Sequence, residues 1–528
     1  MQLKTAFSKY SNYLLVVAVI FLLLCFSFPA NRSENDDGYF FAHAISHSTY
    51  PELLYPRYFL FLPFMKFCYE LGKIVYPALD AYRMMCMMSS LFAALSIVLL
   101  FRILGKKLGA SRSIAWFTCI LLLVSYAFWR YAVEAEVYML SFFVLLLAFD
   151  FLYPGVEQKQ PIPFGRILLA AAFAALAVMF YKPNLIIVGI AYGWPLLVKK
   201  QWRTLLVYGA AMCLLLLMGY YMAYKINPRE FASLMSYLLG GSSHSKGNAL
   251  LSILVVGSNW ASINFVFGIP QFAGFIATHF PNNIIVEEVY AARNLYTLSV
   301  IACCTFLALV GLLLWILYKA IPKVDWKQCW ANPFVVWVLA YSIMLMVLEP
   351  NAPEAWLMIM PPLIVLFGTL PATAYQQLFG MRSLWLLAAV LCLHNFLGGY
   401  LFIQSKQGDY LSYQGAWILK HARQKDLVVS MGSGSLIRYL KYYATAPLCV
   451  PEQQYDSCLV QIDATLARGG NVYLLNDILH PSEAVAFRDK PAFDKVVAFV
   501  QKNSGHIIPV NKGSHTEGIV YQLVSREP

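Results

Sequence analysis

Long apolar stretches separated by short polar ones dominate the first 403 residues. About 20 apolar residues are needed to cross a bilayer. Eleven stretches are apolar enough to do so, at roughly 13–29, 81–101, 113–129, 137–153, 167–181, 184–198, 204–223, 296–318, 333–348, 356–370 and 383–403. The pattern predicts an all-α polytopic membrane bundle over residues 1–403, with long outside loops at 30–80 and 224–295. A further apolar run at 249–277 is broken by Gly and Pro, and it fits either short interfacial helices or a re-entrant pair.

The pattern changes at about residue 404. The last 125 residues contain 24 charged ones and no apolar run long enough to span a membrane. Helical stretches near 410–423, 435–444, 457–468 and 482–502 alternate with strand-like stretches near 426–430, 447–451, 471–476 and 518–525. This alternation predicts a small α/β domain with a largely parallel sheet over residues 404–528.

Composition supports the membrane assignment. Of the 528 residues, 60% are apolar and 12% are charged, against roughly 45–50% and about 25% in soluble domains. These values exclude a secreted disulfide scaffold, a coiled coil and a disordered chain. The first apolar stretch lacks a small-x-small cleavage site, so we expect it to remain as an anchor.

The net charge of +12 is explained by membrane topology without invoking nucleic acid. With a cytoplasmic N-terminus, 15 Lys and Arg residues lie in short inside loops, and 13 of the 16 carboxylates before residue 404 lie outside. This distribution follows the positive-inside rule. An odd number of spans then puts the C-terminal domain outside. This topology fits a bacterial inner membrane, with a periplasmic C-terminal domain, or an endoplasmic reticulum membrane, and we favour the first.

Two cysteines lie in the outside domain. Cys449 and Cys458 have eight residues between them. A disulfide in an oxidising compartment and a pair of buried thiols fit this spacing equally well.

Candidate chemistry begins in the first outside loop. Asp36 and Asp37 are adjacent, an aromatic run at 39–41 follows them, and His43 comes next as a candidate contact to a sugar or acceptor. Adjacent carboxylates can accept a proton, bind a divalent cation such as Mg²⁺ or Mn²⁺, or solvate a loop. The aromatic run favours the first two roles, because it holds the acids at the membrane interface. Further along this loop, residues 58–76 predict an interfacial helix.

The second outside loop contains Glu134 and Glu136 between two apolar helices. Burying a charge there is costly unless a partner or a function compensates. On a helix the two side chains would diverge by about 200°, so we expect only one to face the bundle interior. Glu134 has an alternative role as an ion-pair partner of Arg130. We expect at least one of the two acids to be functional.

Several outside cations are not required by the positive-inside rule. They are Arg57, Lys182, Lys225 and Arg229, and they are candidates for binding a lipid-linked phosphate. Ordinary snorkelling explains each one separately. The rigid outside loop at 349–356 adds Glu349, Asn351 and Glu354, which suit sugar hydroxyls or a cation, although a loop needs polar residues in any case.

Together these features resemble the C-type glycosyltransferase superfamily, multi-span enzymes that use polyprenyl-phosphate-linked sugars. The segment 128–138 is similar to the Ala-x-x-Ala-Glu-Val-Tyr signature of a protein O-mannosyltransferase-like branch, and Glu136 matches its Glu. Residues 36–40 resemble the Asp-Glu-x-x-aromatic pattern of other members. That resemblance implies that Asp36 is the catalytic acid, with Asp37 beside it.

The resulting hypothesis is a transferase that moves a sugar from a polyprenyl-phosphate donor to a hydroxyl of a protein, lipid or glycan. Asp36 is the expected general base, and Arg57, Lys182 and Arg229 are expected to stabilise the leaving phosphate. Glu136 is expected to orient the acceptor or the base. Two alternatives remain, a transporter or flippase of a lipid-linked substrate and a polymerase or ligase of lipid-linked glycans.

Overall fold

The computed structural model describes most of the chain, and the description below is confined to those residues. They are 2–31, 37–154, 162–227, 229, 231–240, 260, 298–323, 332–348, 353–369, 380–405, 409, 411–431, 434–480, 490–511 and 518–524. They form two compact units. The first comprises Met1–Phe28 and His47–Phe402, and the second comprises Pro29–Ser46 and Ile403–Pro528.

The first unit is helical, and a helix occupies each of the eleven predicted segments. These helices are α1 (Gln2–Phe26), α4 (Ala81–Lys107), α5 (Arg112–Val124) with α6 (Tyr126–Ala132), α7 (Tyr138–Leu152), α8 (Phe164–Phe180), α9 (Asn184–Ile186) with α10 (Gly193–Val198), α11 (Trp202–Ile226), α15 (Ser299–Ala320), α17 (Pro333–Leu348), α18 (Pro353–Trp356) with α19 (Met360–Thr369), and α21 (Gly380–Asn395) with α22 (Leu401–Gln404).

Four helices among the described residues are long and apolar enough to be candidate membrane spans by themselves. They are Ala81–Lys107, Trp202–Ile226, Val300–Lys319 and Arg382–Gln404, and the pair α5 and α6, bent by 68°, makes a fifth if it counts as one span. The other apolar helices are shorter. The number of eleven spans therefore stays a prediction, whereas the helical character of each segment is confirmed.

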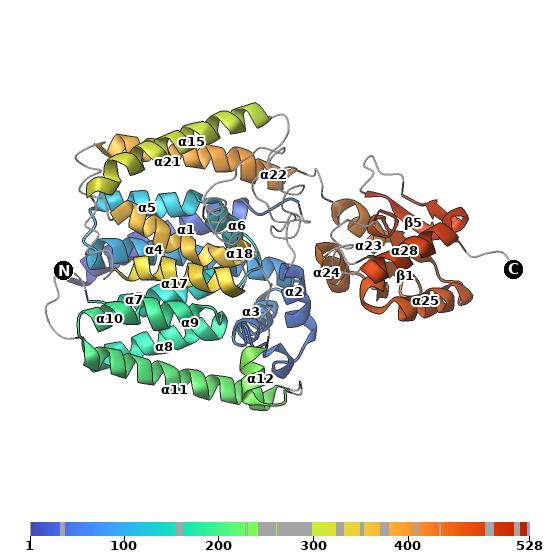
Figure 1. Ribbon diagram of the computed structural model, residues 1–528, viewed down its shortest axis with the longest axis horizontal. Helices are drawn as coiled ribbons and strands as arrows, with labels where there is room; N and C mark the ends of the chain where they lie inside the picture. The colour runs from blue at the N-terminus through green and yellow to red at the C-terminus, as the bar shows by residue number, and fades with distance from the viewer. Residues whose placement is uncertain are drawn as a thin grey trace. The chain divides into compact units, whose positions relative to one another are not determined.

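The helix α7 is buried along most of its length. It packs against α4 and against α8, whose small buried residues Ala170, Ala171 and Ala174 allow close approach of the two backbones. Figure 1 shows α11 beside α8 at one edge of this unit, and α15 beside α21 at another.

The predicted interfacial helix is present as α3 (Phe61–Val75). Its apolar side chains Phe67, Leu71 and Ile74 are exposed, as expected for a helix in contact with lipid. Polar side chains of this helix form contacts within the protein, because Glu70 pairs with Lys66 at 3.0 Å and accepts a 2.6 Å hydrogen bond from the Tyr50 hydroxyl.

The second unit contains a five-stranded mixed sheet. Its order is β2-β1-β3-β5-β4, formed by β2 (Leu448–Cys449), β1 (Leu427–Val429), β3 (Val472–Leu475), β5 (Val520–Leu523) and β4 (Ile507–Pro509). The strands β2, β1 and β3 are parallel, but β5 pairs antiparallel with both β3 and β4. The expectation of a largely parallel sheet therefore fails at β5, which runs against the other four strands. The short strand β4 was missed, and the chain returns directly from β4 into β5.

Helices flank this sheet. They include α23 (Ala416–His421), α24 (Gly434–Tyr443), α25 (Pro451–Ala467) and α28 (Lys490–Lys502). The hydrophobic core contains strand residues such as Leu427, Val472 and Leu474, with Ile462 of α25 and Val496 of α28 packed against them. The strands β1 and β3 are buried along their whole length, as expected for the centre of a sheet.

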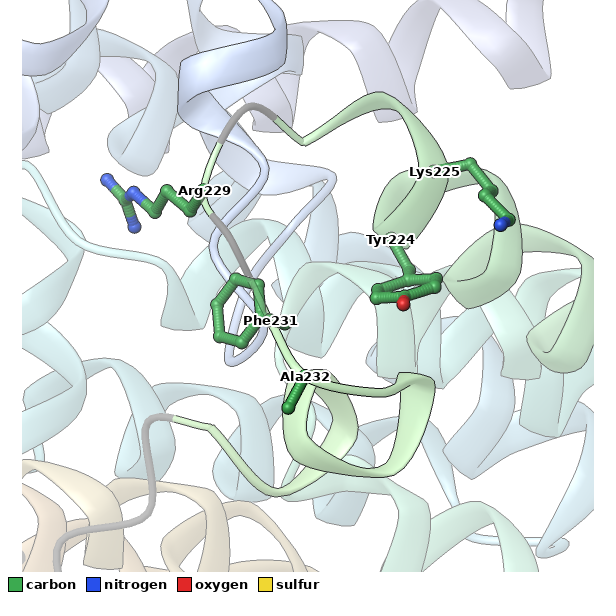
Figure 2. Close-up of a pocket in the computed structure, with 5 residues that line it drawn as sticks. All are labelled: Tyr224, Lys225, Arg229, Phe231 and Ala232. Atoms are coloured by element: carbon green, nitrogen blue, oxygen red, sulfur yellow. The ribbon is translucent and has the colours of Figure 1, made fainter.

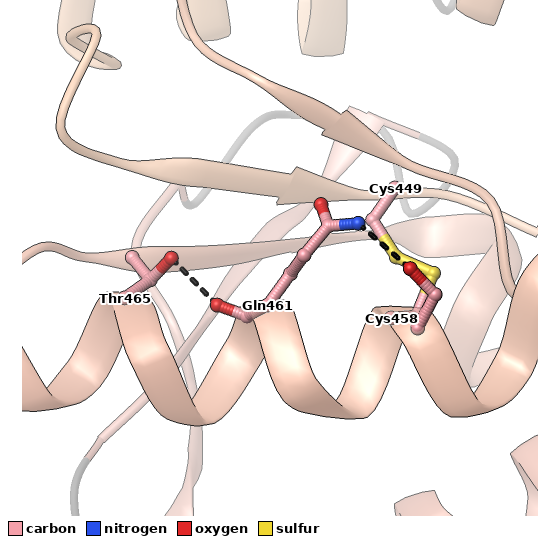
Figure 3. The surroundings of a disulfide bond; sticks show 5 residues. Cys449, Cys458, Gln461 and Thr465 are labelled. Carbon is pink, nitrogen blue, oxygen red and sulfur yellow. Dashed lines mark hydrogen bonds between the residues drawn. A yellow bond between two sulfur atoms is a disulfide. The ribbon is translucent and has the colours of Figure 1, made fainter.

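A disulfide joins Cys449 on β2 to Cys458 on α25, with 5.7 Å between the Cα atoms (Figure 3). Of the two alternatives left by the spacing, the structure has the bonded one. On the same helix, Gln461 donates to the Ser457 hydroxyl, and Thr465 donates to the Gln461 carbonyl (Figure 3). The bond attaches the edge strand β2 to the helix that follows it.

Candidate active site

Two of the predicted phosphate-binding cations lie next to each other in the first unit. Arg57 precedes α3, and Lys182 lies between α8 and α9. The backbone N–H of Lys182 donates to the Arg57 carbonyl at 2.9 Å, and the Arg57 guanidinium carbon lies 5.8 Å from the centre of the Tyr181 ring. The Lys182 ammonium also donates to the Leu238 carbonyl at 2.7 Å. The structure thus brings together two cations that are far apart in the sequence.

Tyr138, the first residue of α7, connects these cations to the carboxylates. Its phenol lies within range of the charges of Glu136, Glu354 and Arg57. Its ring centre is 5.4 Å from that of Tyr181. The charges of three residues predicted from three separate loops therefore act on one tyrosine.

The sequence reading did not select Tyr138 or Tyr181 as site residues. Tyrosines at the ends of apolar helices are common at membrane interfaces, so nothing in the sequence pattern marks these two as site residues. The available signal was their position in the chain, because Tyr138 comes two residues after Glu136 and Tyr181 directly precedes Lys182.

Glu134 and Glu136 are both buried, with residue exposures of 3% and 8%. The expectation that only one faces the interior is therefore wrong. It assumed helical geometry, but the chain leaves the helix at Val133 and re-enters it at Tyr138. In this short connection the N–H of Glu136 donates to the Glu134 carbonyl, and the Ser89 hydroxyl of α4 donates to the Glu136 carbonyl at 3.3 Å.

Glu134 forms an ion pair with Arg130, and the two side chains are 4% and 3% exposed. This is the alternative role considered from the sequence. A buried carboxylate needs such compensation, because an isolated charge in a low-dielectric interior is costly. The ion pair therefore accounts for the presence of Glu134 at this position.

Lys225 and Arg229 line an open hollow of about 620 Å³ together with Tyr224, Phe231 and Ala232. Figure 2 shows their charged groups on opposite sides of the hollow. They therefore do not form a common clamp for one phosphate.

Arg229 lies instead against the loop that carries Arg57. Its guanidinium carbon is 4.0 Å from the centre of the Tyr55 ring. The neighbouring Asn227 donates to the Leu54 carbonyl at 2.6 Å. Two hydrogen bonds from Thr49 lower the pKa of the Glu52 carboxyl, and the charge of Arg229 lowers it further. Arg229 thus shares its surroundings with a carboxylate that the sequence reading had not selected.

Asp37 belongs to the second unit. It is the first residue of α2 (Asp37–His47), and its carboxylate forms an ion pair with Arg438 of α24. His43 lies half-buried on the same helix. The predicted site residues Asp36, Glu349 and Asn351 lie outside the described residues.

The described residues do not assemble a site for a divalent cation. Within the ranges given above, no three His, Cys, Asp or Glu side chains are grouped to hold a metal ion. The carboxylate of Asp37 faces a guanidinium, which is a poor neighbour for a cation at the same oxygens.

Comparison with known proteins gives matches in structure but not in sequence. No family model matches the chain, and no curated protein matches it. The crystal structure of ArnT from Cupriavidus metallidurans bound to undecaprenyl phosphate superposes with a TM-score of 0.57, covering 98% of this chain and 99% of that one at 11% identity. The chain has the ArnT fold. The apo structure of the same ArnT matches with a TM-score of 0.50 at 14% identity, over 98% and 100% of the two chains.

At these identities the likeness to ArnT shows the fold alone. It covers both the helical bundle and the C-terminal domain, because nearly the whole of each chain is matched. Together with the apolar helices, the ArnT fold makes this chain an integral membrane protein with several apolar spans.

Proposed function

We propose that this ArnT-like chain is a membrane glycosyltransferase that moves a sugar from a polyprenyl-phosphate donor to an acceptor hydroxyl on the extracytoplasmic face. The proposal rests on the contact of Arg57 with the Tyr181 ring beside Tyr138, and on the charges of Glu136 and Glu354 that act on the same Tyr138 phenol. Together they combine a phosphate-binding cation with carboxylates that suit sugar hydroxyls. The fold supports it, since ArnT is a protein whose crystal structure contains undecaprenyl phosphate.

The proposed reaction is a displacement at the anomeric carbon of the donor sugar. The acceptor oxygen attacks that carbon, and the carbon–oxygen bond to phosphate breaks. The bonding electrons remain on the phosphate, which leaves as polyprenyl phosphate. The proton of the acceptor hydroxyl passes to the carboxylate of Asp36.

The leaving phosphate gains negative charge as the bond breaks, so a cation nearby lowers the barrier. Arg57 suits this role, because a guanidinium can donate two parallel hydrogen bonds to phosphate. Lys182, which is bonded through its backbone to Arg57, adds a second positive charge. We give Arg229 a supporting role through the Tyr55 loop and give Lys225 none.

The carboxylates divide into structural and functional ones in this proposal. Glu134 compensates Arg130, and Asp37 is paired with Arg438. Asp36 then remains as the base in the first loop. Glu136 and Glu354 orient hydroxyls of the acceptor or sugar beside the ring of Tyr138.

The compartment and the partners are part of the same proposal. A bacterial inner membrane, with the C-terminal domain in the periplasm, agrees with the distribution of charged residues and with the disulfide. The acceptor is a hydroxyl of a protein, lipid or glycan of the cell envelope.

The test is a transfer assay with purified protein in lipid vesicles. The substrates are a polyprenyl-phosphate hexose and an envelope fraction, and the products are analysed by mass spectrometry. We expect addition of a single hexose and release of polyprenyl phosphate, both abolished in Asp36→Asn. Lys73→Ala removes an α3 cation that the proposal does not use and serves as the matched control. Transfer of an intact glycan block, or movement of the unchanged lipid across the bilayer, would contradict the proposal.

A further inference from the structure

The first outside loop is packed into the C-terminal domain. The residues Pro29–Ser46 form one compact unit with Ile403–Pro528. The N–H of Asn31 donates to the Ile403 carbonyl at 2.9 Å, which fixes the start of this segment to the start of the domain. The loop that carries the candidate base is therefore part of the C-terminal unit.

Contacts with α24 hold the helix α2. Tyr39 is only 1% exposed, and its ring centre lies 5.2 Å from that of Tyr439 and 6.3 Å from that of Tyr443. Next to this buried aromatic group, Arg438 pairs with Asp37 at the first turn of α2. The rings supply the apolar contact area, and the ion pair adds a directional constraint at the end of the helix.

Stability alone is a weak reason for this ion pair. The side chains of Arg438 and Asp37 are 35% and 52% exposed, and exposed pairs contribute little to folding. Their geometry has a more specific consequence, because Asp37 directly follows Asp36 in the chain. The ion pair therefore fixes the carboxylate that directly follows the proposed base in the sequence.

The helix α24 is itself firmly held, so it can act as a fixed reference. It connects the buried strand β1 to β2, and the Cys449–Cys458 bond joins β2 to α25. At Gly415 an added Cβ would lie 2.9 Å from the Tyr439 ring, so this glycine allows the chain before α23 to approach α24 closely.

We propose that Arg438 is a positioning residue that acts through Asp37 to hold the start of α2, the helix that directly follows the proposed base in the sequence. This inference rests on the proposed function for its catalytic consequence. It gives the C-terminal domain a direct role in the reaction. The domain holds the loop that carries the base, in addition to any part it plays in recognising the acceptor.

The kinetic test compares Arg438→Ala with the wild type in the transfer assay. We expect kcat to fall roughly tenfold, with little change in the KM for the donor. This size lies between the few-fold effect of losing an exposed ion pair and the roughly hundredfold effect of misplacing a reacting group. Arg438→Lys keeps the charge and is expected to recover part of kcat. Lys441→Ala removes an exposed cation from the same helix and is expected to leave kcat unchanged.

A double-mutant cycle tests whether Arg438 acts through Asp37. If it does, Asp37→Asn combined with Arg438→Ala is no slower than Asp37→Asn alone. A fully additive loss, or a wild-type kcat in Arg438→Ala, would overturn the proposal. Should Arg438→Ala fail to fold, Arg438→Gln replaces it in every comparison.

Hydrogen exchange gives a readout that does not depend on activity. We expect the amides of Asp37–His47 to exchange faster in Arg438→Ala than in Lys441→Ala, and equal rates would overturn the positioning role. If the wild type transfers no sugar but the exchange rates differ, the proposed function fails while the contact between Arg438 and α2 stands. The two failures are thus distinguishable.

Discussion

Replacing Glu134 tests whether this buried acid has a structural role, in contrast to the functional role proposed for Glu136. Its carboxylate and the Arg130 guanidinium are almost completely buried. Removing one partner of such a pair leaves an uncompensated buried charge, which typically costs about 3–5 kcal/mol. We therefore expect Glu134→Gln to lower the free energy of unfolding by about this amount. Replacing both partners with apolar residues, as in Arg130→Met with Glu134→Leu, removes both charges and is expected to recover most of the loss.

The assay is an SDS titration of the detergent-solubilised protein, combined with the transfer assay. The double variant is expected to retain transfer activity, because Glu134 has no step in the reaction. Glu136→Gln provides the comparison within the same loop, since it is expected to fold normally and lose activity. A double variant that is as unstable as Glu134→Gln, or one that is stable but inactive, would refute the structural role of Glu134.

Three further predictions concern the phosphate, the disulfide and the interfacial helix. Arg57→Ala is expected to weaken polyprenyl phosphate binding, measured by native mass spectrometry, about 10- to 150-fold, as for loss of a charged hydrogen bond; unchanged binding would exclude Arg57 from the phosphate site. Cys449→Ser with Cys458→Ser is expected to destabilise the C-terminal domain by about 2–3 kcal/mol, as for a short closed loop; an unchanged unfolding midpoint would contradict this. Hydrogen bonds from Tyr50 and Lys66 lower the pKa of the Glu70 carboxyl. The stability that the ionised carboxylate contributes is therefore present above the usual Glu pKa of about 4.3, and it is lost as the pH falls through the lower pKa of the folded protein. The stability difference between wild type and Glu70→Gln should therefore shrink as the pH is lowered into the acid range, and a difference that does not change with pH would show that this linkage is absent.

The helices of the bundle were predictable because their signal is local. A long apolar run has few ways to satisfy its backbone other than a helix, so each of the eleven segments contained one. Local signals are weaker for short elements. The strand β4 has three residues, and Ile508 on it is exposed, so no apolar alternation marked it.

The site was predictable in its residue types but not in its arrangement. The acids and cations were visible because charge between apolar helices requires an explanation. Which of them meet depends on tertiary structure, as for Asp37 and Arg438, which are 401 positions apart. The burial of both Glu134 and Glu136 was missed because a non-helical connection of five residues leaves no periodic pattern.

The central claim is that polyprenyl phosphate is released as a sugar is transferred. The most direct measurement is therefore the amount of polyprenyl phosphate formed per hexose added to the acceptor, followed by mass spectrometry in vesicles containing the purified protein. We predict one polyprenyl phosphate for each hexose, and none with Asp36→Asn. Hexose transfer that proceeds unchanged in Asp36→Asn, or a donor lipid that is never cleaved, would contradict the account.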